Sequence, residues 1–359
     1  MDNKYLFNRE SNIELFRIIV MMSIIAHHMI VNTAISDNLL PELHDVRNVY
    51  MWMFGMWGKV GINCFVLITG WYMCKSAITL NKFLKLLLEV YFYKFFNYML
   101  LLCLGMQTLS LKKVLYLFSP IENVTSNDFV SCYLVFFLLI PFLNVLIHNI
   151  SEKMHKYLIL LSVGVLCLWN QLYWIEVDCS YLLWFPTLFF VASYFRIYPE
   201  STKKITCFLE KTPLLWIALS IASVIGILWL LPHTTKEISP YYFVVDSNAI
   251  LAFITGLSLF MYFKSIHIKH NKFINVLAAC SFGVLLFHTS FGMRYVLLEK
   301  VMRIPAILYG LSEWWMNLFY SILFMIAIYA IGAAVDIARM FLLEKPIFQA
   351  LDKYIKKYV

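Results

Sequence analysis

Long apolar segments separated by short polar connections run through the whole chain. Apolar runs of about 18–25 residues match the length of a helix that crosses roughly 30 Å of hydrocarbon. Because helices satisfy their own backbone hydrogen bonds in lipid, the pattern predicts an all-α fold: a polytopic membrane helix bundle with about ten transmembrane helices. The predicted spans are residues 13–34, 56–74, 83–105, 129–148, 156–174, 180–197, 212–231, 242–263, 273–293 and 311–340.

Composition supports the same class of protein. Of the 359 residues, 62% are hydrophobic and 14% are charged, whereas soluble domains average about 45–50% and 25%. The first span is predicted to stay in the mature protein, because Arg17 interrupts it and no small-residue cleavage site follows it. We predict one transmembrane domain over residues 1–345 and a basic cytoplasmic tail over residues 346–359.

Basic residues are distributed unequally between the two sets of connections. One set carries nineteen Lys and Arg residues and the other carries seven. Since cytoplasmic loops are enriched in these residues, both termini are predicted to be cytoplasmic. The basic residues are dispersed over short loops, so the formal net charge of +8 does not indicate a nucleic-acid partner. The eight cysteines lie singly and show no metal-ligand spacing, so no metal site is predicted.

The first span contains the most informative polar residues. Arg17 and His28 are eleven residues apart, which at about 100° per residue places them within roughly 20° of the same helix face and about 16 Å apart along the axis. Charged groups at membrane depth usually face the bundle interior and mark sites or pathways. Arg17 is predicted to hold an anionic group that arrives from the cytoplasm, and His28 to accept a proton further out. Glu14 is close enough in sequence to pair with Arg17.

Structural roles for these groups remain open at this point. Arg17 can snorkel to the inner interface while the histidines hydrogen-bond neighbouring helices. Five further polar residues lie within predicted spans and are read mainly as partners of other helices: Lys59, Asn63, Glu89, Lys94 and His288. The aromatic residues are interpreted as interfacial belts rather than as a sugar platform, although Tyr173, Trp174 and Tyr181 on the outer side could serve as one.

Five segments in order resemble the membrane-bound acyltransferase family 3, whose members O-acylate surface carbohydrates. They are NIELFRIIVMMSIIAHH, GINCFVLITGWYM, YLVFFLLIPFLN, FVASYFRIYP and SFGVLLFH. The first carries Arg17 and His28 at the family spacing, and the likeness is closest to the capsule and exopolysaccharide branch. Two positions depart from the family pattern, where Thr69 replaces a serine and Leu285 replaces a tyrosine.

The resemblance implies a reaction and a set of roles. His28 is the expected catalytic residue, and Arg17, Lys82 and Lys85 are the expected donor-binding residues. The lysines replace arginines of the family and so lack the bidentate fork. Glu14, His27 and His288 are the expected supporting residues.

The resemblance also implies the substrates and the location. Acetyl-CoA is the expected donor substrate, no bound cofactor is expected, and the acceptor is a surface polysaccharide or lipid-linked oligosaccharide. The expected location is the bacterial cytoplasmic membrane.

Other function classes fit a basic, apolar, multi-span chain. A transporter of lipid-linked sugars would place Arg and His in its bundle, but the paired Gly/Pro-interrupted segments of broken transport helices are not evident. A polysaccharide polymerase is the closer alternative, although it would be expected to carry a large charged outer loop. A relative that binds without catalysing is the third alternative.

Overall fold

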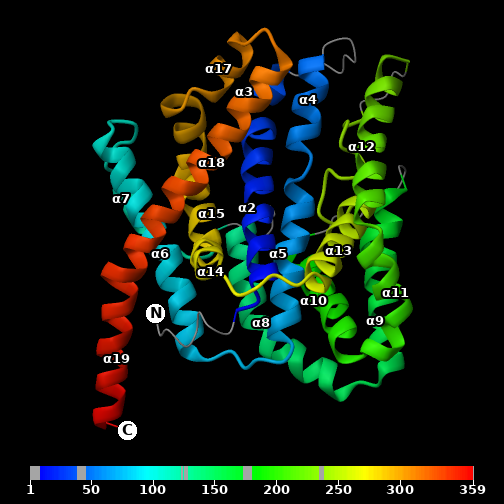
Figure 1. Ribbon diagram of the computed structural model, residues 1–359. Coiled ribbons are helices and arrows are strands. Elements are labelled where there is room, and N and C mark those ends of the chain that lie inside the picture. The colour runs from blue at the N-terminus through cyan, green and yellow to red at the C-terminus, as the bar shows by residue number, and fades with distance from the viewer. Residues whose placement is uncertain are drawn as a thin grey trace.

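The computed structural model describes residues 9–38, 46–122, 124, 128–172, 180–233 and 238–358. Within these residues the fold is entirely helical, as the apolar pattern predicted, and it contains no strand. The helices form an upright bundle, with the start of α2 and the end of α19 towards the same, lower side of the view (Figure 1). The predicted orientation makes this lower side cytoplasmic.

The helix boundaries are as follows. The longer helices are α2 (Ser11–Val31), α5 (Gly58–Met73), α6 (Leu80–Cys103), α8 (Phe129–Asn149), α9 (Glu152–Val163), α10 (Tyr181–Ile197), α11 (Pro199–Lys211), α12 (Pro213–Leu230), α13 (Ile250–Ser265), α18 (Trp314–Arg339) and α19 (Lys345–Tyr358). The shorter helices are α3 (Ala34–Asn38), α4 (Val46–Gly55), α7 (Leu111–Leu117), η1 (Gly164–Leu168), η2 (Trp169–Gln171), η3 (Leu231–His233), α14 (Lys272–Ala279), α15 (Ser281–Thr289), η4 (Ser290–Gly292), α16 (Met293–Tyr295), η5 (Val296–Val301), α17 (Ile304–Gly310) and η6 (Met340–Glu344).

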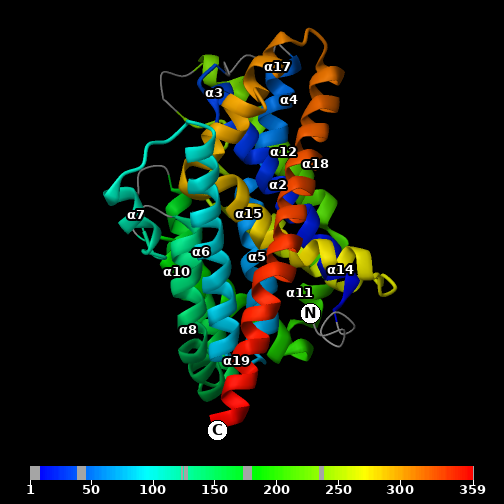
Figure 2. The ribbon, with the colours of Figure 1, turned by 90° about the vertical axis from the view of Figure 1, so that its left-hand side faces the viewer.

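Every predicted span contains a helical segment in its described residues, although in the span 242–263 the helix α13 begins only at Ile250. Seven helical stretches in the described residues are long and apolar enough to cross a membrane, and α10 and α13 are shorter apolar helices. The predicted number of ten spans and the cytoplasmic placement of the termini therefore stay predictions. The last span continues through η6 into α19 without a break in the helical run (Figure 2), so the predicted boundary at residues 345 and 346 falls within a helical run.

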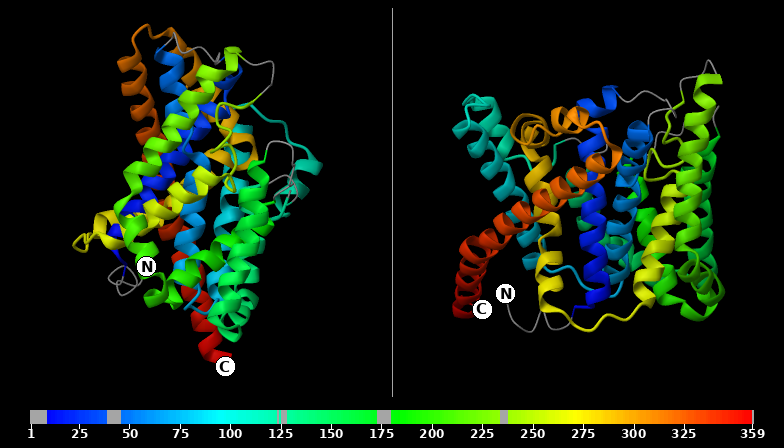
Figure 3. Two further views of the ribbon diagram at one scale, coloured as in Figure 1. Left: turned by 90° about the vertical axis from the view of Figure 1, so that its right-hand side faces the viewer. Right: turned by 45° about the horizontal axis from the view of Figure 1, so that its top comes forward.

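Helix α2 lies at the centre of the bundle, between α5, α15 and α18 (Figures 1 and 3). Its close approach to α5 depends on small residues. A β-carbon built on Gly58 would lie 2.2 Å from Cγ of His27, and one built on Gly61 would lie 2.9 Å from Cγ1 of Ile24. Small residues allow such backbone contact in membrane bundles, so the glycines of α5 set its distance from the histidines of α2.

The predicted span at residues 273–293 is interrupted twice. Helices α14 and α15 are separate, and α15 ends at Thr289. The amide of the fully buried Asn97 donates to the carbonyl oxygens of Leu286, Phe287 and Ser290, at 3.1, 3.1 and 3.2 Å. A helix end buried without partners would leave its last carbonyl groups unsatisfied, and this amide of α6 contacts three carbonyl groups there, of which that of Leu286 also accepts from the backbone N–H of Ser290.

Buried charges join α6 to α18. Arg339, which the charge count assigned to a cytoplasmic connection, is 3% exposed at the end of α18. It contacts the carboxylates of Asp336 at 2.8 Å, Glu344 at 3.0 Å and Glu89 of α6 at 3.5 Å. The hydroxyl of Tyr93 donates to Asp336 at 3.0 Å. Glu89 therefore has the partner on another helix that its sequence position predicted.

Candidate active site

Two histidines from distant parts of the sequence form a directed hydrogen-bond chain. Nδ1 of His288 lies 2.6 Å from the carbonyl oxygen of Val284, and Nδ1 of His28 lies 2.9 Å from Nε2 of His288. A carbonyl oxygen only accepts, so Nδ1 of His288 carries the proton. Its Nε2 then accepts from Nδ1 of His28 when both rings are neutral. This assignment follows from the network and leaves Nε2 of His28 with a free lone pair.

His27 points to a different partner. Its Nδ1 lies 2.7 Å from the carbonyl oxygen of Gly55, at the end of α4. By the same argument Nδ1 donates and Nε2 carries the lone pair. His27 is thus fixed by the backbone, whereas His28 is fixed by a second imidazole. The structure brings the predicted supporting residues His27 and His288 to the same site as His28.

A cavity of about 400 Å³ opens beside these rings. Both His27 and His28 line it, and the lining includes side chains from α5, α8, α10, α15 and α16. Its other polar lining residues are Asn32, Lys59, Asp128, Tyr181, Thr289 and Arg294. Its volume lies within the range of about 300–1,000 Å³ that is typical of small-molecule sites.

Arg17 lines a second cavity, of about 200 Å³, on the lower side of the first. Phe65, Tyr133 and Phe282 line it from α5, α8 and α15. The same three helices also line the cavity at His28, as the prediction that Arg17 and His28 share one face of α2 requires. Nε of Arg17 is buried without a hydrogen-bond partner, and the guanidinium forms no ion pair with the described residues.

The predicted pairing of Glu14 with Arg17 is wrong. Oε2 of Glu14 lies 3.0 Å from the guanidinium of Arg9, which is five residues earlier in the chain. Arg9 is only partly buried and lies just before α2, so its side chain reaches Glu14 in the first turn of the helix. The helix dipole also stabilises a carboxylate at this end. Arg17 is thereby left available to a ligand.

The two lysines predicted to hold the donor differ in their surroundings. Nζ of Lys82 donates to Oγ of Ser76 and to the carbonyl oxygen of Ala77, both at 2.8 Å. Lys82 precedes Leu86 by four residues on α6, so it lies on the face that lines the Arg17 cavity. Nζ of Lys85 lies 3.5 Å from Glu344 and 5.1 Å from the ring centre of Phe348. Neither lysine lines the cavity itself.

A layer of aromatic rings separates the two cavities. Phe65 and Tyr133 line the Arg17 cavity, whereas Phe129 lines the His28 cavity. The ring centres of Phe65 and Phe129 are 6.1 Å apart, and those of Phe129 and Tyr133 are 5.6 Å apart. The hydroxyl of Tyr133 lies 3.2 Å from Oγ1 of Thr69, the residue that departs from the family pattern. A molecule that reached from Arg17 to His28 would have to displace these rings.

Sequence reasoning missed two charged residues of the upper cavity. Asp128 caps α8 by accepting from the backbone N–H of Ser131 at 2.8 Å, and Arg294 follows the break after α15. Their signals in the sequence, a possible N-cap and a basic residue after a glycine, were too weak to distinguish them from ordinary loop residues. Of the three outer aromatic residues, Tyr181 lines the cavity, whereas Tyr173 and Trp174 lie outside the described residues.

The fold and the site define a multi-pass membrane protein with two cavities in one bundle, one lined by Arg17 and Glu89 and the other by His27 and His28. A family model described as "Acyltransferase domain", that of acyltransferase family 3, matches residues 10–334. The chain therefore belongs to this family of membrane acyltransferases. Neither the curated proteins nor the solved structures give a match.

Proposed function

We propose that the protein is an O-acetyltransferase of the bacterial cytoplasmic membrane. It transfers an acetyl group from cytoplasmic acetyl-CoA to a hydroxyl group of a surface or exported polysaccharide, or of its lipid-linked precursor. The observation that carries this proposal is the pair of cavities on one face of α2, with the unpaired Arg17 in the lower and the lone pair of His28 in the upper. Membership of the acyltransferase family supports acyl transfer as the type of reaction.

In this proposal the donor enters from the lower side. The phosphates of acetyl-CoA bind near Arg17 and Lys82, since a guanidinium and an ammonium are the usual phosphate partners. The pantetheine arm passes between α5, α8 and α15, and the rings of Phe65 and Phe129 turn aside to admit it. The thioester then lies in the upper cavity beside His28. Lys85, a turn from Lys82 on α6, is the third proposed phosphate partner, and its ammonium would exchange the exposed ion pair with Glu344 for the donor.

The chemistry follows from the tautomer of His28. In direct transfer, Nε2 accepts the proton of the sugar hydroxyl while the hydroxyl oxygen attacks the thioester carbonyl carbon. The carbon–sulfur bond then breaks, and the departing thiolate takes the proton back from Nε2. In the alternative route, Nε2 attacks the thioester carbonyl carbon, the carbon–sulfur bond breaks, and CoA leaves as the thiolate. The sugar hydroxyl then attacks the acetyl-imidazolium, the carbon–nitrogen bond breaks, and the thiolate takes the hydroxyl proton. His288 accepts from Nδ1 of His28 in both routes and holds the ring in place.

The test compares surface polysaccharide from cells with the intact gene, a deletion and the His28→Ala form. Alkali-labile O-acetyl groups are measured by NMR, and the purified proteins are assayed with labelled acetyl-CoA. Removal of a general base should lower the transfer rate by about 100- to 10,000-fold. Retained acetylation by a correctly folded His28→Ala protein would contradict the role of His28. An unchanged acetyl pattern with loss of chain length or export would instead favour a polymerase or a transporter.

A further inference from the structure

A smaller cavity of about 160 Å³ adjoins the cavity at His28. The two cavities share the lining residues Asp128, Val130, Thr289 and Arg294. The smaller cavity has room for several waters or for a charged substituent of an acceptor. It lies where the part of an acceptor next to the reacting hydroxyl would reach.

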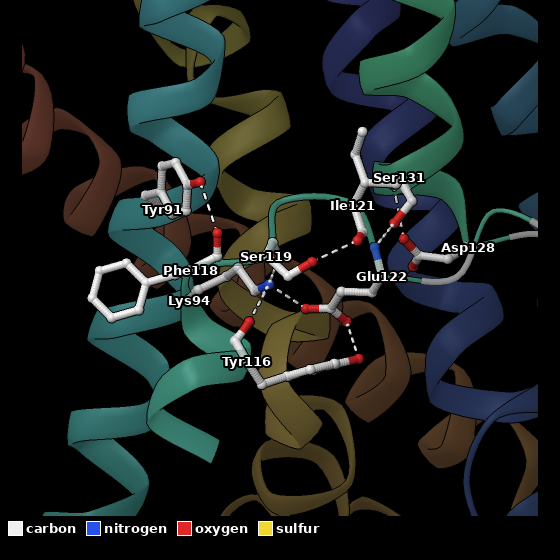
Figure 4. Close-up of polar contacts among 9 residues, drawn as sticks. All are labelled: Tyr91, Lys94, Tyr116, Phe118, Ser119, Ile121, Glu122, Asp128 and Ser131. Atoms are coloured by element: carbon white, nitrogen blue, oxygen red, sulfur yellow. Dashed lines mark hydrogen bonds and ion pairs between the residues drawn. The ribbon is translucent and has the colours of Figure 1, made fainter. Parts of the chain in front are cut away.

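Two basic residues, Lys94 and Arg294, line the smaller cavity, and the charge of Lys94 is neutralised by a neighbouring carboxylate. The buried ammonium of Lys94 forms an ion pair with Glu122 and donates to the carbonyl oxygens of Ser119 and Tyr116 (Figure 4). The backbone N–H of Glu122 donates to Oγ of Ser131 at 2.9 Å. These contacts fix the segment after α7 as a wall of the cavity, and they leave Lys94 without a free donor direction for a ligand.

Arg294 differs from Lys94 in this respect. Within the part of the chain that the structure describes, its guanidinium forms no hydrogen bond and no ion pair, although Asp128 attracts it electrostatically. The carboxylate of Asp128 is engaged as the cap of α8. Arg294 and Lys59 together outnumber the one carboxylate of the larger cavity. The two connected cavities therefore carry a net positive charge, with one unpaired guanidinium at their junction.

The backbone places Arg294 at this junction through a constrained turn. Phe291 has φ 57° and Gly292 has φ 79°, and a left-handed conformation is uncommon for a bulky residue such as phenylalanine. The ring of Phe291 packs on Tyr98 with centres 4.8 Å apart, and Asn97 holds the carbonyl groups just before the turn. The turn is thus supported by α6, and it directs the chain back over the cavity.

We propose that this junction is a subsite for an anionic group of the acceptor, held by Arg294 while the reacting hydroxyl lies at His28. The inference rests on the proposed function and adds the chemical class of its acceptor. A guanidinium fork matches the two oxygens of a carboxylate or a phosphate. The anion is therefore either the carboxylate of a sugar acid or the phosphate of a lipid-linked glycan.

The experiment uses the full-length protein in nanodiscs, labelled acetyl-CoA, and glycan isolated from the deletion strain. The lipid-linked and polymeric glycans are each tested intact, after carbodiimide-promoted reduction of carboxylates, and after removal of phosphate. The treatment that lowers kcat/KM identifies the source of the anion. Since a hydrogen bond to a charged group is lost, we expect a decrease of about 10- to 100-fold, mainly in KM.

The variants are Arg294→Gln and Arg294→Lys, with Lys300→Gln as the matched control, because Lys300 is exposed on the same outer segment and lines neither cavity. Arg294→Gln should lower kcat/KM for the intact glycan to the value of the treated glycan, and should not lower the latter further. Arg294→Lys should be intermediate, and Lys300→Gln unchanged. Thermal unfolding confirms that each variant is folded.

Three results would overturn the proposal in distinguishable ways. If neither treatment lowers kcat/KM of the unaltered protein, the acceptor site does not bind an anion. If Arg294→Gln lowers the values for intact and treated glycans equally, Arg294 supports the fold only. If the unaltered protein acetylates no glycan at all, the proposed function fails and the subsite fails with it.

Discussion

At the scale of single residues, the site depends on the hydrogen-bond direction that Val284 imposes. Its carbonyl oxygen fixes the proton on Nδ1 of His288, and this in turn fixes the proton on Nδ1 of His28. The lone pair of Nε2 is then available for a hydroxyl proton without a change of tautomer. His288 acts as a positioning residue in this arrangement, because its ring touches His28 and is not required to meet the substrate.

Replacement of His288 should therefore affect the rate more than donor binding. His288→Ala removes the acceptor for Nδ1 of His28, and a misplacement of about 1 Å at a reacting group can cost about 100-fold. We expect kcat to fall by up to that factor with little change in KM for acetyl-CoA. His288→Gln, whose amide oxygen can accept the same hydrogen bond, should recover part of the loss. Equal kcat for the two variants would exclude a positioning role.

The sequence indicated part of this site. The spacing of Arg17 and His28 predicted their common face because a helix has a fixed angle per residue. The contact between His28 and His288 joins residues 260 positions apart, and no helical period relates them. The pairing of Glu14 was predicted wrongly because helical spacing favours Arg17, three residues away. Arg9 precedes α2, so its reach to Glu14 depends on the path of the chain before the helix, which no helical period describes.

At the scale of helices, the contact between α2 and α5 sets the position of both histidines. The missing side chain of Gly58 provides the space that the ring of His27 occupies. The sequence predicted both spans from their apolar length, but it gave no information on which helices touch. The predicted second span, residues 56–74, matches α5, but the prediction did not include α4, which begins at Val46 and is separated from α5 by the short turn after Gly55.

Gly58→Ala tests this contact. The added methyl group would overlap the imidazole of His27, and overpacking of a close contact typically costs about 1–3 kcal/mol. We expect a lower unfolding temperature in detergent and reduced acetyl transfer, because α5 must move away from α2. Gly226→Ala in α12 is the matched control, since nothing lies within 4 Å of its added β-carbon. Equal thermal stability of the two variants would show that a methyl group at position 58 fits between α2 and α5 without displacing either helix.

At the scale of the whole molecule, the proposed reaction requires one fixed orientation in the membrane. Acetyl-CoA is made in the cytoplasm, so the Arg17 cavity must face that side and the Arg294 junction must face outwards. The excess of Lys and Arg in one set of connections predicts this orientation. The buried Arg339 belongs to the network of Glu89 and Asp336, and removing it from the count leaves the asymmetry large. Loop charge thus predicts the orientation in the membrane, about which helix packing alone gives no information.

The orientation can be measured with single cysteines in a variant that lacks the eight native ones. Lys112→Cys, in the segment of α7, is predicted to face outwards, and Lys203→Cys, in α11, is predicted to face the cytoplasm; both positions are exposed. A membrane-impermeant maleimide should label position 112 in intact cells and position 203 only after permeabilisation. The reverse pattern would place Arg17 on the outer side, where acetyl-CoA is absent, and would exclude the proposed path of the donor. Labelling of both positions in intact cells would instead place both on the outer side. The number of membrane crossings between α7 and α11 would then be even, whereas the predicted topology requires an odd number.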